Sequence, residues 1–167
     1  MTGEPSEAGR LTRAGTFILA VGTCYLAAAV GSAFTALSVN TWYARLVKPP
    51  FTPPGWFIGV VWTVLFFLMG VSLFLVLEMD GERPGVKRGI SLFSVQLGLN
   101  VIWSLLFFGL RSPLLALIGV LLLWGLVAAT LLQFLSISRP AAYLLVPYLA
   151  WVTIAAGLNA GILLLNP

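Results

Sequence analysis

Five long apolar stretches follow one another along this chain, and they restrict the folds it can adopt. A bilayer core about 30 Å thick is crossed by roughly 20 apolar residues in a helix. We place spans at about residues 14–37, 56–77, 89–110, 114–135 and 141–165. The composition, 60% hydrophobic and 8% charged, lies outside the range of soluble proteins. The sequence therefore predicts an all-α integral membrane protein with a single five-transmembrane-helix bundle over residues 14–167, preceded by a frayed polar tail, residues 1–13.

The charged residues lie in the tail, in the loops or at span ends. The basic residues on the N-terminal side are Arg10, Arg13, Arg83, Lys87, Arg88 and Arg139, against Arg45, Lys48 and Arg111 on the other side. By the positive-inside rule this distribution predicts a cytoplasmic N-terminus. Lipid headgroups and topology explain the basic residues, so we expect no nucleic-acid partner. A proton- or ion-coupled transporter places an ionisable group inside the membrane, and no such group is present, which weighs against that class.

The residue types that hold most metals and haems are scarce. The chain has no histidine and one cysteine, Cys24, which lies inside the first apolar stretch. A disulfide within the chain is therefore impossible, and histidine-ligated haem and zinc are excluded. We expect no metal site and no cofactor.

Four prolines stand between the first two spans, in the stretch from Trp42 to Trp62. Pro49, Pro50, Pro53 and Pro54 fix φ and remove backbone donors, so this connection is expected to be non-helical, extended and stiff. A stiff loop costs less to order over a cavity than a flexible one. We interpret it as a lid or wall of a site that opens between membrane helices.

Carboxamides and indoles are the polar groups within the spans. Gln96, Asn100 and Ser104 are spaced by four residues and share one face of the third helix. Buried amides need partners, so this face must point into the bundle or a cavity. One reading is interhelical hydrogen bonding. The other is a ligand-binding face, because Trp103 and Phe107 lie beside the amides.

The fifth span carries a proline and further aromatic residues. Pro147 leaves the carbonyl of Tyr143 without its helical donor and predicts a kink near Trp151. Trp124 has no polar neighbours on its own helix face and is expected in the core or facing lipid. The residues that we predict to line a slot for a flat, mostly apolar ligand are Trp62, Phe66, Trp103, Phe107, Tyr148 and Trp151, with Gln96 and Asn100 as amides.

Four motifs in this chain resemble those of one family. They are WYxxLxKPxxxPPGW at 42–56, VW at 61–62, QLxLNxxWSxxFF at 96–108 and VPYLAW at 146–151. They resemble the TspO/translocator-protein family, also called tryptophan-rich sensory proteins or peripheral benzodiazepine receptors. The resemblance runs in order through nearly the whole chain. It implies a five-helix bundle, often dimeric, with a pocket open toward the loop between the first two helices.

The resemblance also implies ligands and residues. Family members bind porphyrins, including protoporphyrin IX, and benzodiazepine-type ligands. The positions that match the family's pocket are Tyr43, Pro53, Trp62, Phe66, Asn100, Trp103, Phe107, Trp151 and Ala155. Trp62 and Trp151 match the tryptophans implicated in light-dependent porphyrin breakdown, and so would be the catalytic residues of a degrading enzyme. The animal sterol motif has a basic residue at the end of the fifth helix that this sequence lacks, so sterol binding is not expected.

Three functions therefore stay open. The first is a membrane receptor or sensor for protoporphyrin IX, haem-pathway tetrapyrroles and benzodiazepine-type ligands, in which Arg45 or Lys48 meets the ligand's carboxylates. The second is a light-dependent porphyrin-degrading enzyme. The third is a facilitated tetrapyrrole transporter or a regulatory scaffold. A homodimer is expected in the lipid membrane, because Gly157 and Gly161 form a GxxxG spacing and small residues stripe the first span.

Overall fold

The computed structural model describes residues 7–79 and 81–166, with side chains from Thr12 onward. The helices are α1 (Glu7–Ala36), α2 (Trp42–Arg45), α3 (Gly55–Leu77), α4 (Val86–Ser104), the π-helix η1 (Leu105–Gly109), α5 (Pro113–Leu135), α6 (Arg139–Leu144) and α7 (Val146–Leu165). α4 continues into η1, and α6 into α7. Five segments of the described chain are therefore long and apolar enough to cross a membrane, which confirms the predicted fold class.

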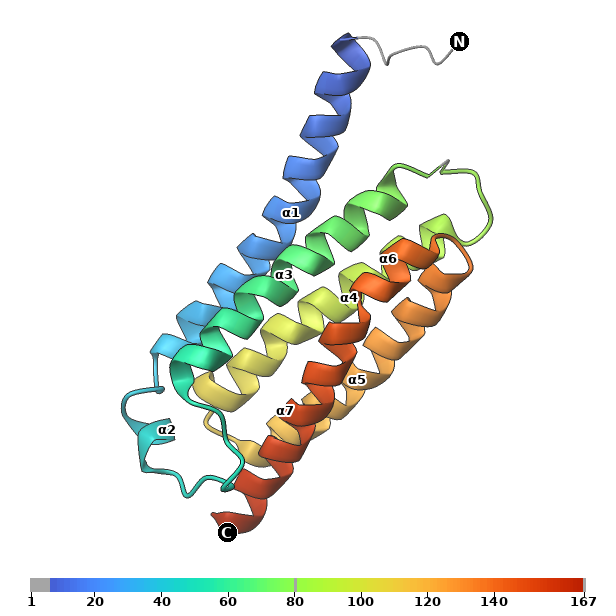
Figure 1. The fold of residues 1–167 in the computed structure, drawn as a ribbon. Helices are drawn as coiled ribbons and strands as arrows, with labels where there is room; N and C mark the ends of the chain where they lie inside the picture. The colour runs from blue at the N-terminus through green and yellow to red at the C-terminus, as the bar shows by residue number, and fades with distance from the viewer. Residues whose placement is uncertain (1–6, 80, 167) are drawn as a thin grey trace.

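The long helices form an elongated bundle with α2 and the proline-rich loop at one end (Figure 1). α1 packs against α3 and α4, α5 packs against α4 and α7, and the short helix α6 packs between α3 and α5. α1 begins at the end opposite to α2, and α7 ends near the loop. The C-terminal residues of the bundle are therefore in reach of the loop between α1 and α3.

Two predictions are wrong in part: the one for the N-terminal tail and the one for the connection after α1. Residues 7–13, expected to be frayed, belong to α1, while residues 1–6 lie outside the described chain. The connection after α1 contains one helical turn, α2, which forms because its residues lie before the first proline. The carbonyl of Ser38 accepts the Tyr43 N–H at 2.9 Å. From Leu46 to Pro54 the loop is non-helical, as the prolines predict.

The predicted kink in the fifth span is present. The helix is interrupted at Leu145, whose N–H donates to the carbonyl of Ala142 at 3.0 Å, and resumes at Val146. Pro147 has no N–H to give to Tyr143, so the α-helical ladder breaks here. The buried hydroxyl of Ser72 on α3 donates to the Ala141 carbonyl at 2.7 Å and holds the bent segment in place.

The half of the bundle away from the loop is closely packed. The rings of Phe17 and Phe74 meet edge to face at 5.3 Å, and those of Phe93 and Phe134 stack at 6.1 Å. At Gly70 the two backbones nearly touch, because an added Cβ would lie 2.7 Å from the Cα of Val21. α1 and α3 are therefore in direct contact in this half.

Several of the small residues that we considered as an interface between copies pack within the chain. Ala20 and Cys24 are buried in the core, and Gly31 lies against Ser104. Gly161 is covered by Pro49 of the loop, whereas Gly157 has open space beside it. The predicted GxxxG surface is thus half occupied by the protein's own loop.

Trp124 differs from its prediction in one respect. Its ring is 42% exposed on the outside of α5, as expected for a side chain facing lipid. Its indole N–H donates to the hydroxyl of Thr153 on α7 at 2.9 Å. The polar neighbour comes from another helix, so the spacing along α5 gave no sign of it.

Candidate ligand pocket

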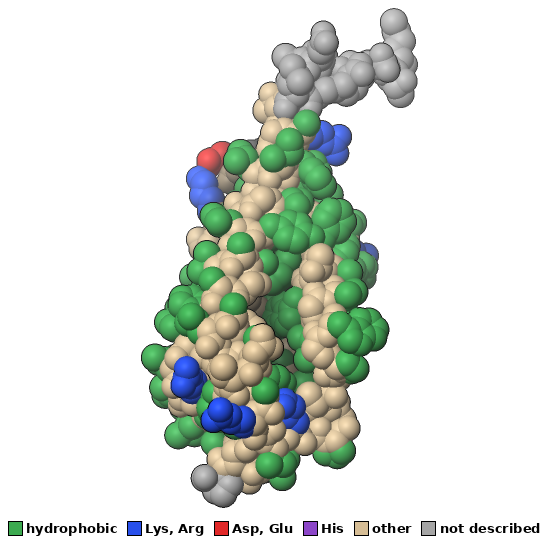
Figure 2. Space-filling view, turned by 90° about the vertical axis from the view of Figure 1, so that its left-hand side faces the viewer, with side chains coloured by type: hydrophobic (Ala, Val, Ile, Leu, Met, Phe, Trp, Pro, Cys, Tyr) green, Lys and Arg blue, Asp and Glu red, His purple; other side chains and the backbone are tan. Residues whose placement is uncertain are grey.

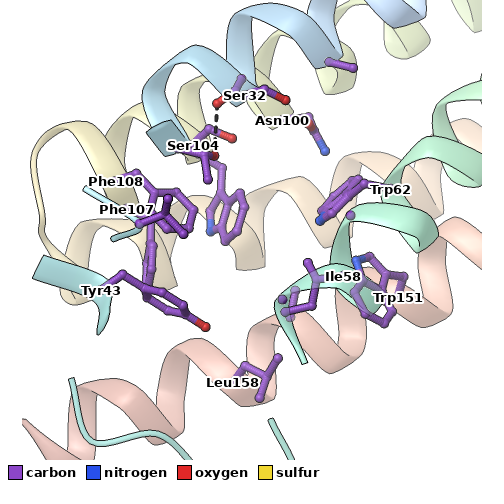
Figure 3. A pocket seen from close by; sticks show the side chains of 18 of the residues that line it. Ser32, Tyr43, Ile58, Trp62, Asn100, Ser104, Phe107, Phe108, Trp151 and Leu158 are labelled. Carbon is purple, nitrogen blue, oxygen red and sulfur yellow. Dashed lines mark hydrogen bonds between the residues drawn. The ribbon is translucent and has the colours of Figure 1, made fainter. Parts of the chain in front are cut away.

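A cavity of about 350 Å³ occupies the loop half of the bundle, between α1, α3, α4 with η1, and α7. Most of its walls are aromatic or aliphatic side chains, with a few amides and hydroxyls (Figure 3). This volume lies within the range of small-molecule sites, which are usually apolar hollows with a few placed polar groups. The cavity is therefore large enough to hold an organic ligand.

Three indoles from three helices form the inner wall. Trp62 of α3 lies 6.4 Å from Trp103 of α4 and 6.5 Å from Trp151 of α7, measured between ring centroids. The rings of Trp62 and Trp151 are perpendicular. Phe66 extends this cluster beside Trp62 at 5.6 Å, and Phe107 stacks beside Trp103 at 5.8 Å. Helices distant in sequence thus contribute one continuous aromatic surface.

One carboxamide of the predicted polar face is held by a partner across the bundle. The side-chain nitrogen of Asn100 donates to the hydroxyl of Tyr148 at 3.0 Å, and both residues are buried. Asn100 borders the cavity, whereas Tyr148 lies behind the wall, where its ring contacts Trp62 at 6.2 Å. The interhelical hydrogen-bond reading of this face is therefore correct for Asn100.

Other buried polar atoms have no hydrogen-bond partner among the described residues. They are the indole nitrogens of Trp103 and Trp151, the side-chain oxygen of Asn159, and both polar atoms of Gln96. A buried group left without a partner costs about 1–3 kcal/mol. Trp103, Trp151 and Asn159 line the cavity, whereas Gln96 does not.

The π-helix η1 shapes the wall next to the loop. Leu110 donates its N–H to Leu105, five residues back, and Pro113 has no N–H to offer to Phe108. The carbonyl of Phe108 instead accepts the hydroxyl of Ser38 at 2.7 Å, which ties the start of the loop to the bundle. Short π-helical turns occur frequently at functional sites. Sequence analysis missed this segment.

Tyr43 and Lys48 lie at the loop end of the cavity. The ring of Tyr43 packs against Phe107 at 5.8 Å and Phe108 at 5.5 Å, and burial raises the pKa of its hydroxyl above the usual value of 10. The ammonium group of Lys48 lies 4.6 Å from the centre of the Tyr43 ring, whereas Arg45 is exposed. Lys48 is therefore a cation in contact with a residue that lines the pocket.

The far side of the loop is fastened to the end of α7. The side-chain oxygen of Asn166 accepts the Val47 N–H at 3.0 Å, and its nitrogen donates to the Val47 carbonyl at 2.9 Å. Pro49 is buried against Gly161. Sequence analysis missed Asn166, because a lone amide at a helix end carries no signal of a contact more than a hundred residues away.

The predicted binding residues divide into two groups. Those that line the cavity are Tyr43, Trp62, Phe66, Asn100, Trp103, Phe107, Trp151 and Ala155. Those that do not line it are Pro53, Gln96 and Tyr148. Pro53 lies in the loop, Gln96 lies one turn deeper in the core, and Tyr148 supports Asn100 from behind. Lining residues that were not predicted come largely from α1, α3 and the end of α7, including Tyr25, Ser32, Gly59, Thr63, Leu158 and Ile162.

Comparison with known proteins agrees with the motifs. The TspO/MBR family model matches residues 20–165. A tryptophan-rich protein TspO of Chlorobaculum tepidum is 45% identical over 152 residues, 91% of this chain and 96% of that protein. One of Archaeoglobus fulgidus is 46% identical over 136 residues, 81% of this chain and 87% of that protein.

Animal proteins align over a shorter part of the chain. The translocator protein of Bos taurus is 39% identical over 131 residues, 78% of each chain. The resemblance seen in the four motifs is thereby confirmed, and the chain belongs to the TspO/MBR family.

Proposed function

We propose that this protein is a membrane receptor or sensor that binds porphyrins, such as protoporphyrin IX and other haem-pathway tetrapyrroles, and benzodiazepine-type ligands in the cavity beneath the α1–α3 loop. The observation that carries the proposal is the convergence of Trp62, Trp103 and Trp151 around a cavity of about 350 Å³ that also contains Asn100. Flat aromatic molecules gain the most binding energy from such rings, through stacked or edge-to-face contacts.

The polar groups of the site suit a ligand that is acidic at one edge. The Lys48 ammonium group lies beyond Tyr43, at the loop end of the cavity, and would meet a carboxylate there. Among the residues that the structure describes, no charged side chain lines the cavity wall. A porphyrin, which has an apolar macrocycle and two propionates on one edge, fits this division between apolar wall and cationic end.

A titration tests the proposal. Protoporphyrin IX added to the protein in lipid nanodiscs should quench tryptophan fluorescence in a saturable way, and a benzodiazepine-type ligand should compete. Replacing Trp62 and Trp151 together with Phe should weaken porphyrin binding at least tenfold. Trp124→Phe is the matched control, because Trp124 lies outside the cavity. Equal affinity in all three proteins would remove Trp62 and Trp151 from the site.

A second function is favoured by the contact between Trp62 and Trp151. The two rings lie 6.5 Å apart and both border the cavity, so both would touch a bound pigment. We propose light-dependent porphyrin degradation as the alternative activity. Illumination of the complex in air should then bleach the porphyrin Soret band faster than free porphyrin, and the Phe variants should be slower. Bleaching at the same rate without protein would reject this activity.

Three further proposals concern the protein in its membrane. Any porphyrin transport would be facilitated, because the spans carry no ion-coupling group. The N-terminus lies in the cytoplasm, so the loop at the other end of α1 lies on the opposite side of the membrane. A membrane-impermeant thiol reagent added from outside should then label F51C, because Phe51 is 60% exposed in this loop. The protein forms a homodimer through a surface that does not include Gly161, and cross-linking in nanodiscs would detect it.

A further inference from the structure

The cavity has an opening on the side of the bundle. Ser32 on α1 and Gly55, Gly59 and Thr63 on α3 line the cavity and are also exposed on the outer surface. We call the gap between them the window. An added Cβ at Gly55 or Gly59 would meet nothing within 4 Å, so the window is open there. Figure 2 shows a hollow with hydrophobic side chains inside it on this face of the molecule.

The dimensions of the window follow from the helices that border it. Gly55 and Thr63 are eight residues apart, which at 1.5 Å per residue is about 12 Å along α3. The hydroxyl of Tyr25 on α1 donates to the Thr63 carbonyl at 3.1 Å and closes the gap at one end. Beyond that bond, α1 and α3 are in contact at Val21 and Gly70. The window is therefore an opening about 12 Å long on its α3 side, closed at one end by the Tyr25 hydroxyl, and a flat molecule could enter it edge first.

The surface around the window is hydrophobic. Large apolar side chains next to it are strongly exposed, among them Leu26 at 67% and Val30 at 42% on α1, and Trp56 at 72% and Val60 at 55% on α3. In a chain with five membrane spans such a surface faces lipid chains. The mouth of the cavity thus opens to the bilayer and not to water.

The opposite route, through the loop, is obstructed. The loop is tied to η1 by Ser38 and to α7 by the two hydrogen bonds between Asn166 and Val47. Pro49 is seated on Gly161 as well. Loading from water past the loop would have to disturb these contacts, whereas entry through the window leaves them in place.

We infer that the pocket is loaded sideways from the bilayer, through the window between α1 and α3, while Asn166 keeps the loop fastened over the aqueous end. This inference rests on the proposed function and narrows its ligand class to planar molecules that dissolve among lipid chains and carry an acidic group at one edge. Such a molecule enters with its apolar body in the acyl region and its carboxylate near Lys48.

The rate of porphyrin transfer from vesicles to protein tests the route. Gly59→Phe fills the mouth of the window and should slow association of protoporphyrin IX at least tenfold. Dissociation should slow by a similar factor, so the affinity should change less than threefold. Gly125→Phe is the control, because Gly125 is exposed, lies outside the cavity and also has open space. Asn166→Ala should change the association rate less than twofold. Faster association in Asn166→Ala, with no slowing in Gly59→Phe, would overturn the inference.

A second measurement needs no porphyrin and separates the window from the proposed function. In a protein whose three tryptophans that do not line the cavity, Trp42, Trp56 and Trp124, are replaced by Phe, the remaining indoles report on the cavity. Phospholipids brominated in the acyl chain should quench them, and Gly59→Phe should reduce that quenching at least twofold. Quenching by aqueous acrylamide but not by brominated lipid would refute the window. Lipid quenching without any porphyrin binding would reject the proposed ligand and leave the window in place.

Discussion

The seam between α1 and α3 has two halves that the same pair of helices builds differently. In the half away from the loop, Gly70 lets the backbones approach until Val21 fills the contact, and Phe17 packs on Phe74. In the loop half, Trp62 of α3 packs beside Phe66 of its own helix and against the rings of Trp103 on α4 and Trp151 on α7, and α1 presents small residues that leave a cavity. The comparison teaches that side-chain size along one seam decides between solid packing and a binding site.

The largest loss of stability should come from a substitution in the closely packed half, away from the loop. In Gly70→Ala the new methyl group would lie 2.7 Å from the Val21 Cα, so a backbone must move. Overpacking of this kind costs about 2–3 kcal/mol. We expect a clear fall in the thermal unfolding midpoint in detergent, measured by circular dichroism.

The matched control is Gly22→Ala, since Gly22 lies on α1 with open space beside it. It should be neutral or slightly stabilising, because alanine favours helix over glycine. If Gly70→Ala unfolds at the same temperature as the control, the two halves do not differ in packing as described.

A smaller loss of stability is expected from the buried hydrogen bond between Asn100 and Tyr148. Tyr148→Phe removes the acceptor of the Asn100 amide in a buried site. An unpaired buried donor costs about 1.5 kcal/mol, within the range measured for hydrogen bonds inside membrane proteins. The unfolding free energy should fall by that amount. Tyr143→Phe, at a residue that is 62% exposed, serves as the control and should change it by less than about 0.5 kcal/mol.

Much of the fold could be predicted because spans and breakers are local signals. The apolar runs predicted the five spans, Pro147 predicted the kink, and the prolines after Leu46 predicted the non-helical loop. The positions where these predictions were wrong are also instructive. α2 forms where no proline restricts the chain. α1 already begins at Glu7, and near its start Arg13 forms an ion pair with Glu78, the residue after α3, at 3.0 Å.

The candidate site was predictable where chemistry shows in a residue's type. Indoles and amides inside spans are conspicuous, and eight predicted positions line the cavity. The contribution of α1 was not predictable, because small residues such as Ala28 and Ser32 indicate close packing just as well as open space. Asn166 and η1 depend on tertiary contacts that no local pattern encodes.

Asn166→Ala tests how firmly the loop between α1 and α3 is held over the cavity. The variant loses two hydrogen bonds to Val47, so the free energy of local opening of the loop should fall by about 1 kcal/mol. Hydrogen exchange at the Val47 amide should then be about fivefold faster, with the exchange of Leu73 in the solid half unchanged. Asn166→Asp keeps the acceptor for the Val47 N–H and should show an intermediate rate. An unchanged Val47 rate in both variants would mean that the contacts of Pro49 and Ser38 hold the loop without Asn166.

The smallest effect should appear at Tyr25, where the two halves meet. Its hydroxyl joins α1 to the Thr63 carbonyl at 3.1 Å, but the side chain is 38% exposed, so Tyr25→Phe should lower the unfolding free energy by only about 0.5 kcal/mol. The bond lies at the end of the window, and without it α1 is freer to separate from α3. Porphyrin transfer from vesicles should therefore become about twofold faster, although the protein is slightly less stable. A change in stability without a change in rate would show that the solid half, from Val21 onward, already fixes the distance between the helices.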